Sequence, residues 1–184
     1  TEKATNRVLT FAVDGDGRLG PATVTASPAP TPFGFAFGRG DTLLVSEAAG
    51  GAAGASTLSS YRLGGDGAAS LVSAAVPSGQ SAACWVVTTR DGRHAFVSNT
   101  ASGNLSTYRI DGATASLTAA IAANTGNGSG PTDMALDRNS RYLYTLDPRN
   151  GNIVAMRVAA DGALTQIETE AARLQPFVTG LAAR

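Results

Sequence analysis

The sequence is poor in the residues that most often carry catalysis or bind metals. Its 184 residues include one cysteine, Cys84, and one histidine, His94, and 15% of them are charged. A single cysteine excludes an internal disulfide. A single histidine excludes a histidine-rich metal site, and any Ser-His-Asp triad would have to use His94 itself. We expect neither a resident metal ion nor a cofactor.

The sequence also has no excess of charge of either sign and no long apolar run. The 14 basic and 14 acidic residues balance to a formal net charge of zero. Because no basic run is present either, we expect no nucleic-acid partner and no docking to a membrane surface. Apolar runs stay well below the roughly 20 residues that a membrane-spanning helix needs. No targeting segment is recognisable, and the compartment stays open between secreted bacterial and cytoplasmic.

Small residues are abundant where charged residues are scarce. Against this background, one pattern of residues recurs along the chain. A bulky residue follows small or β-branched residues and precedes an Asp-Gly pair by a few positions. It stands at Phe11, Tyr61, Tyr108 and Met156, in steps of 50, 47 and 48 residues. Asp-Gly between alternating segments is the usual chemistry of a β-hairpin turn. No stretch shows helical periodicity over three turns, so the pattern indicates strands.

Two further markers recur in phase with the first. Apolar strands end in a polar residue at positions 2, 47, 99 and 147, and strands often led by proline align at positions 34, 84, 133 and 180. Each period of about 48 residues divides into four short antiparallel strands, which is the design of a β-propeller blade. The sequence therefore predicts an all-β partial β-propeller of about four blades.

The predicted domain is single, and its blades follow the repeat. We expect the end of one blade at 1–28, whole blades at 29–79, 80–128 and 129–174, and the first strand of a closing blade within 175–184, at Phe177–Ala183. Closed propellers need about four to eight blades, and an open ring leaves an unpaired edge. We therefore expect the chain to be part of a larger assembly that a second chain or a symmetry mate closes.

Several motifs resemble those of one family. Val45-Ser46-Glu47, Ala83-Cys84-Trp85, Val97-Ser98-Asn99-Thr100 and Pro131-Thr132-Asp133-Met134-Ala135-Leu136 are similar to segments of the seven-bladed lactonase-type propellers. That family includes 6-phosphogluconolactonase-like proteins and carboxymuconate cyclases. The resemblance covers nearly the whole chain and matches the C-terminal half of a family member. It implies hydrolysis or cyclisation of a small lactone or carboxylate metabolite, with a small molecule as substrate.

The resemblance also implies particular site residues. Catalytic members carry Arg and His just after the proline that opens a blade, whereas the present chain has Phe33-Gly34 and Thr132-Asp133 there. The glutamate after the second strand is matched by Glu47. The alternative function is a non-catalytic propeller that binds a small molecule or a protein on its rim.

Polar residues of the predicted rim are the candidates for chemistry. Lactone opening needs an activated water and a stabilised oxyanion. Glu47 or Asp133 are the candidate bases, Asn99 or Arg149 are candidate polarising donors, and Glu2 and Asp147 complete the ring. The competing interpretation is that these side chains cap strand ends and satisfy loop backbone groups. A ring of carboxylates is also able to hold a hard cation, although no spacing specifies one.

Other tempting motifs have structural interpretations. About five residues of extended chain separate Cys84 from the turn before His94, which places them roughly 16 Å apart and argues against a nucleophile–base pair. We expect Cys84 to be a small buried residue and His94 a surface turn residue. Gly15–Gly20 matches a dinucleotide fingerprint but lies on a hairpin with no following helix. We expect inter-blade packing from four aromatic residues: Tyr61, Trp85, Tyr108 and Tyr144.

Overall fold

The computed structural model describes residues 1–175 and 178–183, and this part of the chain consists almost wholly of β-strands. One short 3-10 helix, η1 (Ala49–Gly51), interrupts them. The strands are β1 (Arg7–Val13), β2 (Leu19–Ala26), β3 (Pro32–Phe37), β4 (Thr42–Glu47), β5 (Thr57–Leu63), β6 (Ala69–Pro77), β7 (Ala83–Thr88), β8 (His94–Asn99), β9 (Asn104–Asp111), β10 (Thr114–Asn124), β11 (Met134–Leu136), β12 (Tyr142–Asp147), β13 (Asn152–Val158) and β14 (Leu164–Ala171).

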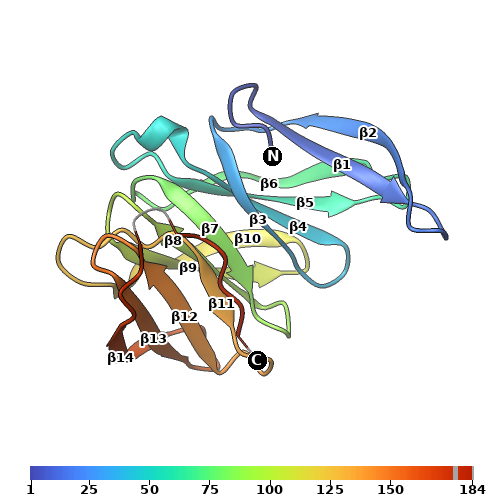
Figure 1. Cartoon of the computed structure of the whole chain (residues 1–184). Coiled ribbons are helices and arrows are strands. Elements are labelled where there is room, and N and C mark those ends of the chain that lie inside the picture. Colours follow the sequence, from blue (N-terminus) through green and yellow to red (C-terminus); the bar gives the residue numbers. More distant parts are fainter. Residues whose placement is uncertain (176–177, 184) are drawn as a thin grey trace.

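The strands form successive antiparallel sheets in chain order. A two-stranded sheet, β1-β2, precedes three four-stranded sheets, β3 to β6, β7 to β10 and β11 to β14. Figure 1 shows these sheets fanned one after another, from β1 and β2 at one end of the molecule to β13 and β14 at the other. The prediction of an all-β partial propeller of about four blades is confirmed, with three whole sheets and one half sheet.

The first strand of each whole sheet lies next to the first strand of its neighbour. β3 packs beside β7, and β7 packs beside β11. The approach of β3 to β7 is very close at Gly34, where a Cβ atom would lie 2.4 Å from the carbonyl oxygen of Cys84. The absence of a side chain at this position is what permits the contact. The innermost strands are therefore gathered at one hub.

Hydroxyl groups connect neighbouring sheets at this hub. Ser46 Oγ donates to the carbonyl oxygen of Cys84 at 2.8 Å, and it accepts from the Gly34 N–H at 3.1 Å. Ser98 Oγ similarly accepts from Trp85 N–H at 2.9 Å and contacts the Thr132 carbonyl oxygen of the next sheet at 3.4 Å. The repeated serine before the polar strand end thus links a second strand to two first strands.

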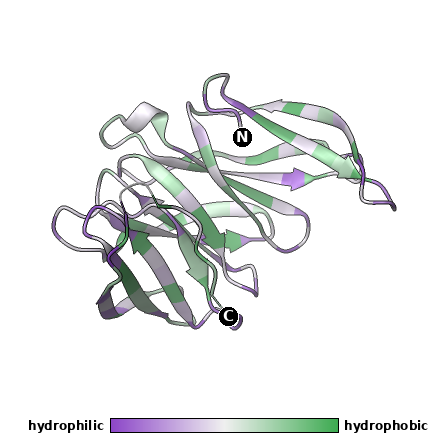
Figure 2. Cartoon of the chain, viewed as in Figure 1, coloured by the Kyte–Doolittle hydropathy of each residue, from purple (hydrophilic) through white to green (hydrophobic). Residues whose placement is uncertain are grey.

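The hydrophobic core lies between the sheets. Three clusters of buried side chains fill the successive spaces: one around Val8 and Tyr61, one around Leu58 and Tyr108, and one around Phe96 and Met156. Figure 2 shows the apolar residues along the strands and the polar ones concentrated in the turns. The repeated bulky residues Tyr61, Tyr108 and Met156 are at most 1% exposed, in agreement with a role in inter-sheet packing.

The two ends of the chain differ from the whole sheets. Phe11, the first bulky repeat residue, is 43% exposed. Its equivalents Tyr61, Tyr108 and Met156 share core clusters with the preceding sheet, and no sheet of the described residues precedes β1 and β2. The strand expected at Phe177–Ala183 is not formed by residues 178–183, and Phe177 lies outside the described residues. Among the described residues, no strand pairs with this segment. Its Gly180 N–H instead donates to Asp133 Oδ2 at 2.6 Å.

Candidate functional site

Three of the predicted rim residues occupy equivalent positions at one end of the sheets. Glu47, Asn99 and Asp147 are the last residues of β4, β8 and β12, and each pairs with the first residue of the following strand. All three are fully buried. The structure thus brings the repeat positions to one rim, which we call the upper rim and define by the ends of β4, β8 and β12. Glu2 differs from them, because it is exposed and accepts a hydrogen bond from Thr5 Oγ1.

Glu47 is held by hydroxyl groups from two other segments. Thr57 Oγ1, at the start of β5, donates to Oε2 at 2.7 Å, and Ser27 Oγ, after β2, contacts Oε1 at 3.4 Å. Burial raises the pKa of Glu47 above its ordinary value, and hydrogen bonds from neighbouring serine and threonine hydroxyls offset part of that rise. Burial, followed by the charge of Glu47, raises the pKa of nearby Tyr61 to about 12. Glu47 is a buried carboxyl group whose hydrogen-bonding partners are able to rotate.

Asn99 connects strands β8 and β9 through its amide. Its Nδ2 donates to Asn104 Oδ1 at 3.0 Å and to Ser106 Oγ at 2.8 Å. Asn104 Nδ2 in turn donates to Gln80 Oε1 at 2.7 Å. The Oδ1 atom of Asn99 is buried and has no hydrogen-bond partner within the described residues. The donors of Asn99 are already engaged in the sheet.

Asp147 and Arg149 hold the loop before β11. Asp147 Oδ1 accepts from the Gly130 N–H at 2.9 Å, and its Oδ2 accepts from Asn150 Nδ2 at 2.9 Å. The Arg149 side chain lies against Gly130 and reaches the Ser129 carbonyl oxygen at 3.4 Å. These two residues shape the rim by binding its backbone.

Asp133 lies at the start of the inner strand β11 and is 3% exposed. Its Oδ1 accepts from the Met134 N–H at 2.7 Å, and its Oδ2 accepts from the Gly180 N–H. Main-chain groups therefore occupy both carboxylate oxygens. Burial raises the pKa of the Cys84 thiol on the neighbouring inner strand, and the charge of Asp133 adds to this rise. Cys84 is half-buried.

Two clefts are lined by other residues. One, of about 720 Å³, is mainly apolar and lies between β1 and the sheet of β3 to β6, with Val8, Phe11, Phe35 and Leu43 in its walls. The other, of about 800 Å³, lies at the opposite end of the sheets, which we call the lower rim and define by the turns β3–β4, β7–β8 and β11–β12. His94 lines this second cleft.

The prediction that His94 is a surface turn residue is wrong. His94 is the first residue of β8 and is 5% exposed, because its ring lies over Gly162 of the β13–β14 turn. Local sequence placed the residue beside a turn but did not show that the next sheet covers it. The lower rim also carries arginines that the sequence analysis did not single out. A signal was available for two of them that line the cleft, since Arg39 and Arg90 each stand second in the turn after a first strand, as Arg138 does in the third sheet. Arg141, which also lines the cleft, does not stand at that repeat position.

Within residues 1–175 and 178–183, no helix is both long and apolar enough to cross a membrane. The same residues contain no group of three or more His, Cys, Asp or Glu side chains placed to hold a metal ion.

Comparison with known proteins gives one family. The family model described as "Lactonase, 7-bladed beta-propeller" matches residues 1–180. A search of curated proteins gives no significant match.

Solved structures show the same fold at low sequence identity. The periplasmic gluconolactonase of Pseudomonas aeruginosa aligns with a TM-score of 0.71 and 18% identity, over 95% of this chain and 51% of that one. A "putative 6-phosphogluconolactonase" of Bacteroides fragilis aligns with a TM-score of 0.69 and 21% identity, over 90% of this chain and 50% of that one. A Lactobacillus plantarum protein aligns with a TM-score of 0.72 and 16% identity, over 91% and 52%. The chain spans about half the length of these structures.

Proposed function

Because this chain belongs to the lactonase family of seven-bladed β-propellers, we propose that it contributes its blades to a ring that hydrolyses a small lactone. The family match over residues 1–180 is the observation that carries the proposal. The printed descriptions of two similar structures, a gluconolactonase and a 6-phosphogluconolactonase, favour an aldonolactone as the substrate class. Cyclisation of a carboxylate metabolite, which the resemblance also implies, has no such support.

The reaction sets clear requirements for the upper rim. Water adds to the lactone carbonyl carbon, the ring C–O bond breaks, and the ring oxygen receives a proton. A base must take a proton from the water, and a donor must stabilise the negative oxygen. Glu47 suits the base, because burial raises its pKa toward the working range and its hydroxyl partners are able to turn toward a new acceptor. Asp133 suits that role less well, since two main-chain N–H groups fix its carboxylate.

In this proposal the other candidate residues position the rim. Asn99 and Asp147 use their polar atoms on neighbouring strands and loops, and Arg149 covers the loop before β11. They act by holding the loops that border the substrate. Because the polar atoms of these residues are already bonded within the protein, they also favour the second candidate function, a non-catalytic propeller that binds a small molecule or a protein on its rim.

Closure of the ring is part of the proposal. The half sheet β1-β2 leaves an apolar cleft of about 720 Å³, and Phe11 and Phe37 are 43% and 63% exposed at its walls. Such surfaces are normally covered in a stable protein. We propose that further blades cover them, supplied by a longer polypeptide, a second chain or a symmetry mate.

The test is lactone hydrolysis by the complete ring. Glucono-δ-lactone and its 6-phosphate would be offered, and acid release would be followed at constant pH with correction for spontaneous opening. Loss of a positioned general base costs about 10²- to 10⁴-fold, so Glu47→Gln is expected to lower kcat at least about 100-fold. Glu168→Gln, at an exposed position on β14, is the matched control. Unchanged turnover in Glu47→Gln would remove Glu47 from the mechanism, and absence of hydrolysis in the intact ring would favour the binding protein.

A further inference from the structure

The cleft of about 800 Å³ at the lower rim is separate from the lactonase site proposed above. His94 and Asn99 are the first and last residues of β8, and six residues of strand place these rims about 17 Å apart. The cleft is lined by turns of three sheets: β3–β4, β7–β8 and β11–β12. Its volume lies within the range of about 300–1,000 Å³ that is usual for sites of small molecules.

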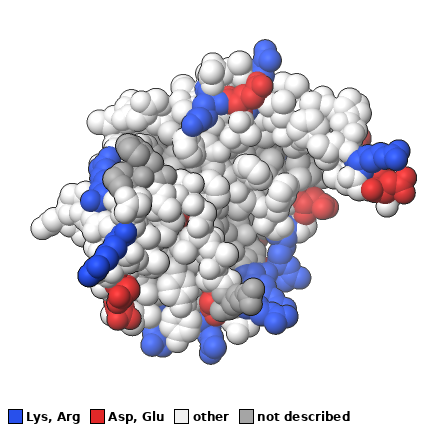
Figure 3. All heavy atoms as spheres, viewed as in Figure 1, with Lys and Arg blue, Asp and Glu red and all other residues white. Residues whose placement is uncertain are grey.

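The charge of this cleft is predominantly positive. Arg39, Arg90 and Arg141 line it together with one acidic residue, Asp91, which leaves two positive charges. Figure 3 shows Lys and Arg side chains gathered where the β3–β4 and β7–β8 turns lie in Figure 1. Among the described residues, none of these three guanidinium groups forms a hydrogen bond or an ion pair. Each therefore retains its donors for a ligand.

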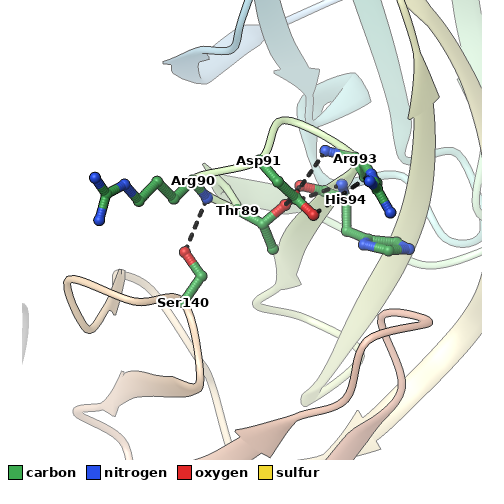
Figure 4. Close-up of polar contacts among 6 residues, drawn as sticks. All are labelled: Thr89, Arg90, Asp91, Arg93, His94 and Ser140. Carbon is green, nitrogen blue, oxygen red and sulfur yellow. Dashed lines mark hydrogen bonds and ion pairs between the residues drawn. The ribbon is translucent and has the colours of Figure 1, made fainter.

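The single acidic residue is already engaged by its own turn. Asp91 Oδ1 accepts from Thr89 Oγ1 at 2.6 Å and from the Arg93 N–H at 3.0 Å. Arg93 Nε lies 3.6 Å from Asp91 Oδ2. Figure 4 shows this arrangement, in which the Arg90 side chain extends away from Asp91. Asp91 thus neutralises Arg93 and stabilises the turn, and it does not pair with the three arginines of the cleft.

A buried polar side chain forms part of the cleft wall. His94 is 5% exposed and lines the cleft, and its ring nitrogens form no hydrogen bond with any described residue. Gly162 lies so close that a Cβ there would be 2.5 Å from His94 Cδ2, which restricts where the ring can go. An imidazole that lines the cleft and has no partner among the described residues retains hydrogen-bonding capacity that a ligand is able to use.

The walls of the cleft are fixed to one another across the sheets. The Arg90 N–H donates to Ser140 Oγ at 2.8 Å, and Thr88 Oγ1 donates to the Phe37 carbonyl oxygen at 3.2 Å. The stem of Arg39 lies on Gly92, where a Cβ would be 2.9 Å from Arg39 Cγ. Because these contacts exist without a ligand, the backbone of the cleft needs little further ordering, and the ordering cost of binding falls on the arginine side chains.

From these observations we propose that the lower-rim cleft binds a small, multiply charged anion through its phosphoryl or carboxylate oxygens, with Arg39, Arg90 and Arg141 as charged donors and His94 as an inner contact. Guanidinium groups match both kinds of oxyanion by paired N–H donors. The site lies at the opposite end of the strands from the upper rim, so its occupant need not be the lactone.

The test is calorimetric titration of the complete protein with inorganic pyrophosphate and, separately, with citrate, at constant low ionic strength. Tighter binding of one probe identifies its oxygen chemistry. We expect saturable binding at one site, weakened at least tenfold by Arg90→Gln and by Arg141→Gln. Arg18→Gln, in the exposed β1–β2 turn, removes the same charge elsewhere and is expected to weaken binding less than twofold.

Two more variants separate this site from other effects. His94→Phe keeps a ring over Gly162 but removes its nitrogens, and it is expected to weaken binding severalfold; if it does not fold, the arginine variants decide alone. Glu47→Gln is expected to bind the anion like the wild type whether or not lactone hydrolysis is lost. Absence of saturable binding, or equal weakening by Arg18→Gln, would overturn the proposal.

Discussion

The two rims of this propeller use their polar residues in opposite ways. At the upper rim, Glu47, Asn99 and Asp147 are fully buried and bound to neighbouring strands and loops. At the lower rim, Arg39, Arg90 and Arg141 are exposed, and only the turn residues beneath them are engaged. The comparison teaches that repeated polar positions differ in how far they are already engaged. Asn99 and Asp147 hold neighbouring strands and loops, Glu47 is buried among hydroxyl groups, and the guanidinium groups of the lower rim have no partner among the described residues. Burial and partners, not residue type, distinguish the two cases.

The largest expected effect tests the hub on the upper-rim side. In Gly34→Ala the new Cβ would lie 2.4 Å from the Cys84 carbonyl oxygen and 2.9 Å from Trp85 Cα, both backbone atoms. Relief requires a shift of β3 against β7, and overpacking of this kind costs about 1–3 kcal/mol. We expect a loss near 3 kcal/mol in urea unfolding followed by circular dichroism.

The matched control for this change is Gly65→Ala, where a Cβ meets no atom within 4 Å and the φ angle is not positive. A similar loss in both variants would show that the hub contact is not special.

The next effect tests whether Asn99 builds the sheet. Asn99→Ala leaves the buried side chains of Asn104 and Ser106 each without one partner. Leaving buried polar groups unsatisfied costs about 1–3 kcal/mol, and we expect about 2 kcal/mol in the same unfolding measurement. Asn139→Ala, at an exposed lower-rim position, is expected to stay within about 0.5 kcal/mol. Equal effects would remove the contrast between the rims.

The smallest expected effect concerns one carboxyl group of each rim, Glu47 and Asp91. Their contributions to stability are expected to depend on pH in opposite directions. Burial raises the folded-state pKa of Glu47 from 4.5, so its contribution to stability is present below pH 4.5 and is lost as the pH rises through the raised pKa. The hydrogen bond from Thr89, followed by that from the Arg93 N–H, lowers the pKa of Asp91 from 3.8. Its contribution is therefore present above pH 3.8 and is lost as the pH falls through the lowered pKa.

The measurement is urea unfolding of Glu47→Gln and Asp91→Asn beside the wild type from pH 3 to pH 8. Relative to the wild type, Glu47→Gln should gain stability as the pH rises, whereas Asp91→Asn should lose it. If the stability of both variants, relative to the wild type, changed in the same direction with pH, burial would not be what controls the pKa of Glu47.

The sequence repeat predicted much of this fold, because the formation of a strand or a turn depends largely on the residues within it. Alternating residues, Asp-Gly turns and the bulky positions Tyr61, Tyr108 and Met156 were enough to predict strands, their order and a core between sheets. The polar strand ends Glu47, Asn99 and Asp147 were likewise predicted to share one rim.

Contacts between sheets were harder to predict. His94 is buried by Gly162, which is 68 residues further along the chain, and Glu47 takes hydrogen bonds from Ser27 and Thr57 on two different segments. Such partners depend on how far one sheet is rotated from the next, which no local pattern specifies. Whether the lower-rim arginines have hydrogen-bond partners depends in the same way on how the neighbouring sheets are placed.

The serine bonds at the hub have a consequence for how this chain is divided for experiments. Ser46 joins β4 to the first strand of the following sheet, β7, and Ser98 joins β8 to Thr132 in the segment that leads into β11. In repeat proteins, contacts of this kind between nearest neighbours add to the stability of the separate repeats. A truncation made between two sheets would respect the chain's repeat, but it would separate each serine hydroxyl from its acceptor. The hydroxyl would stay on the N-terminal piece, and the carbonyl group would be left unpaired on the C-terminal piece.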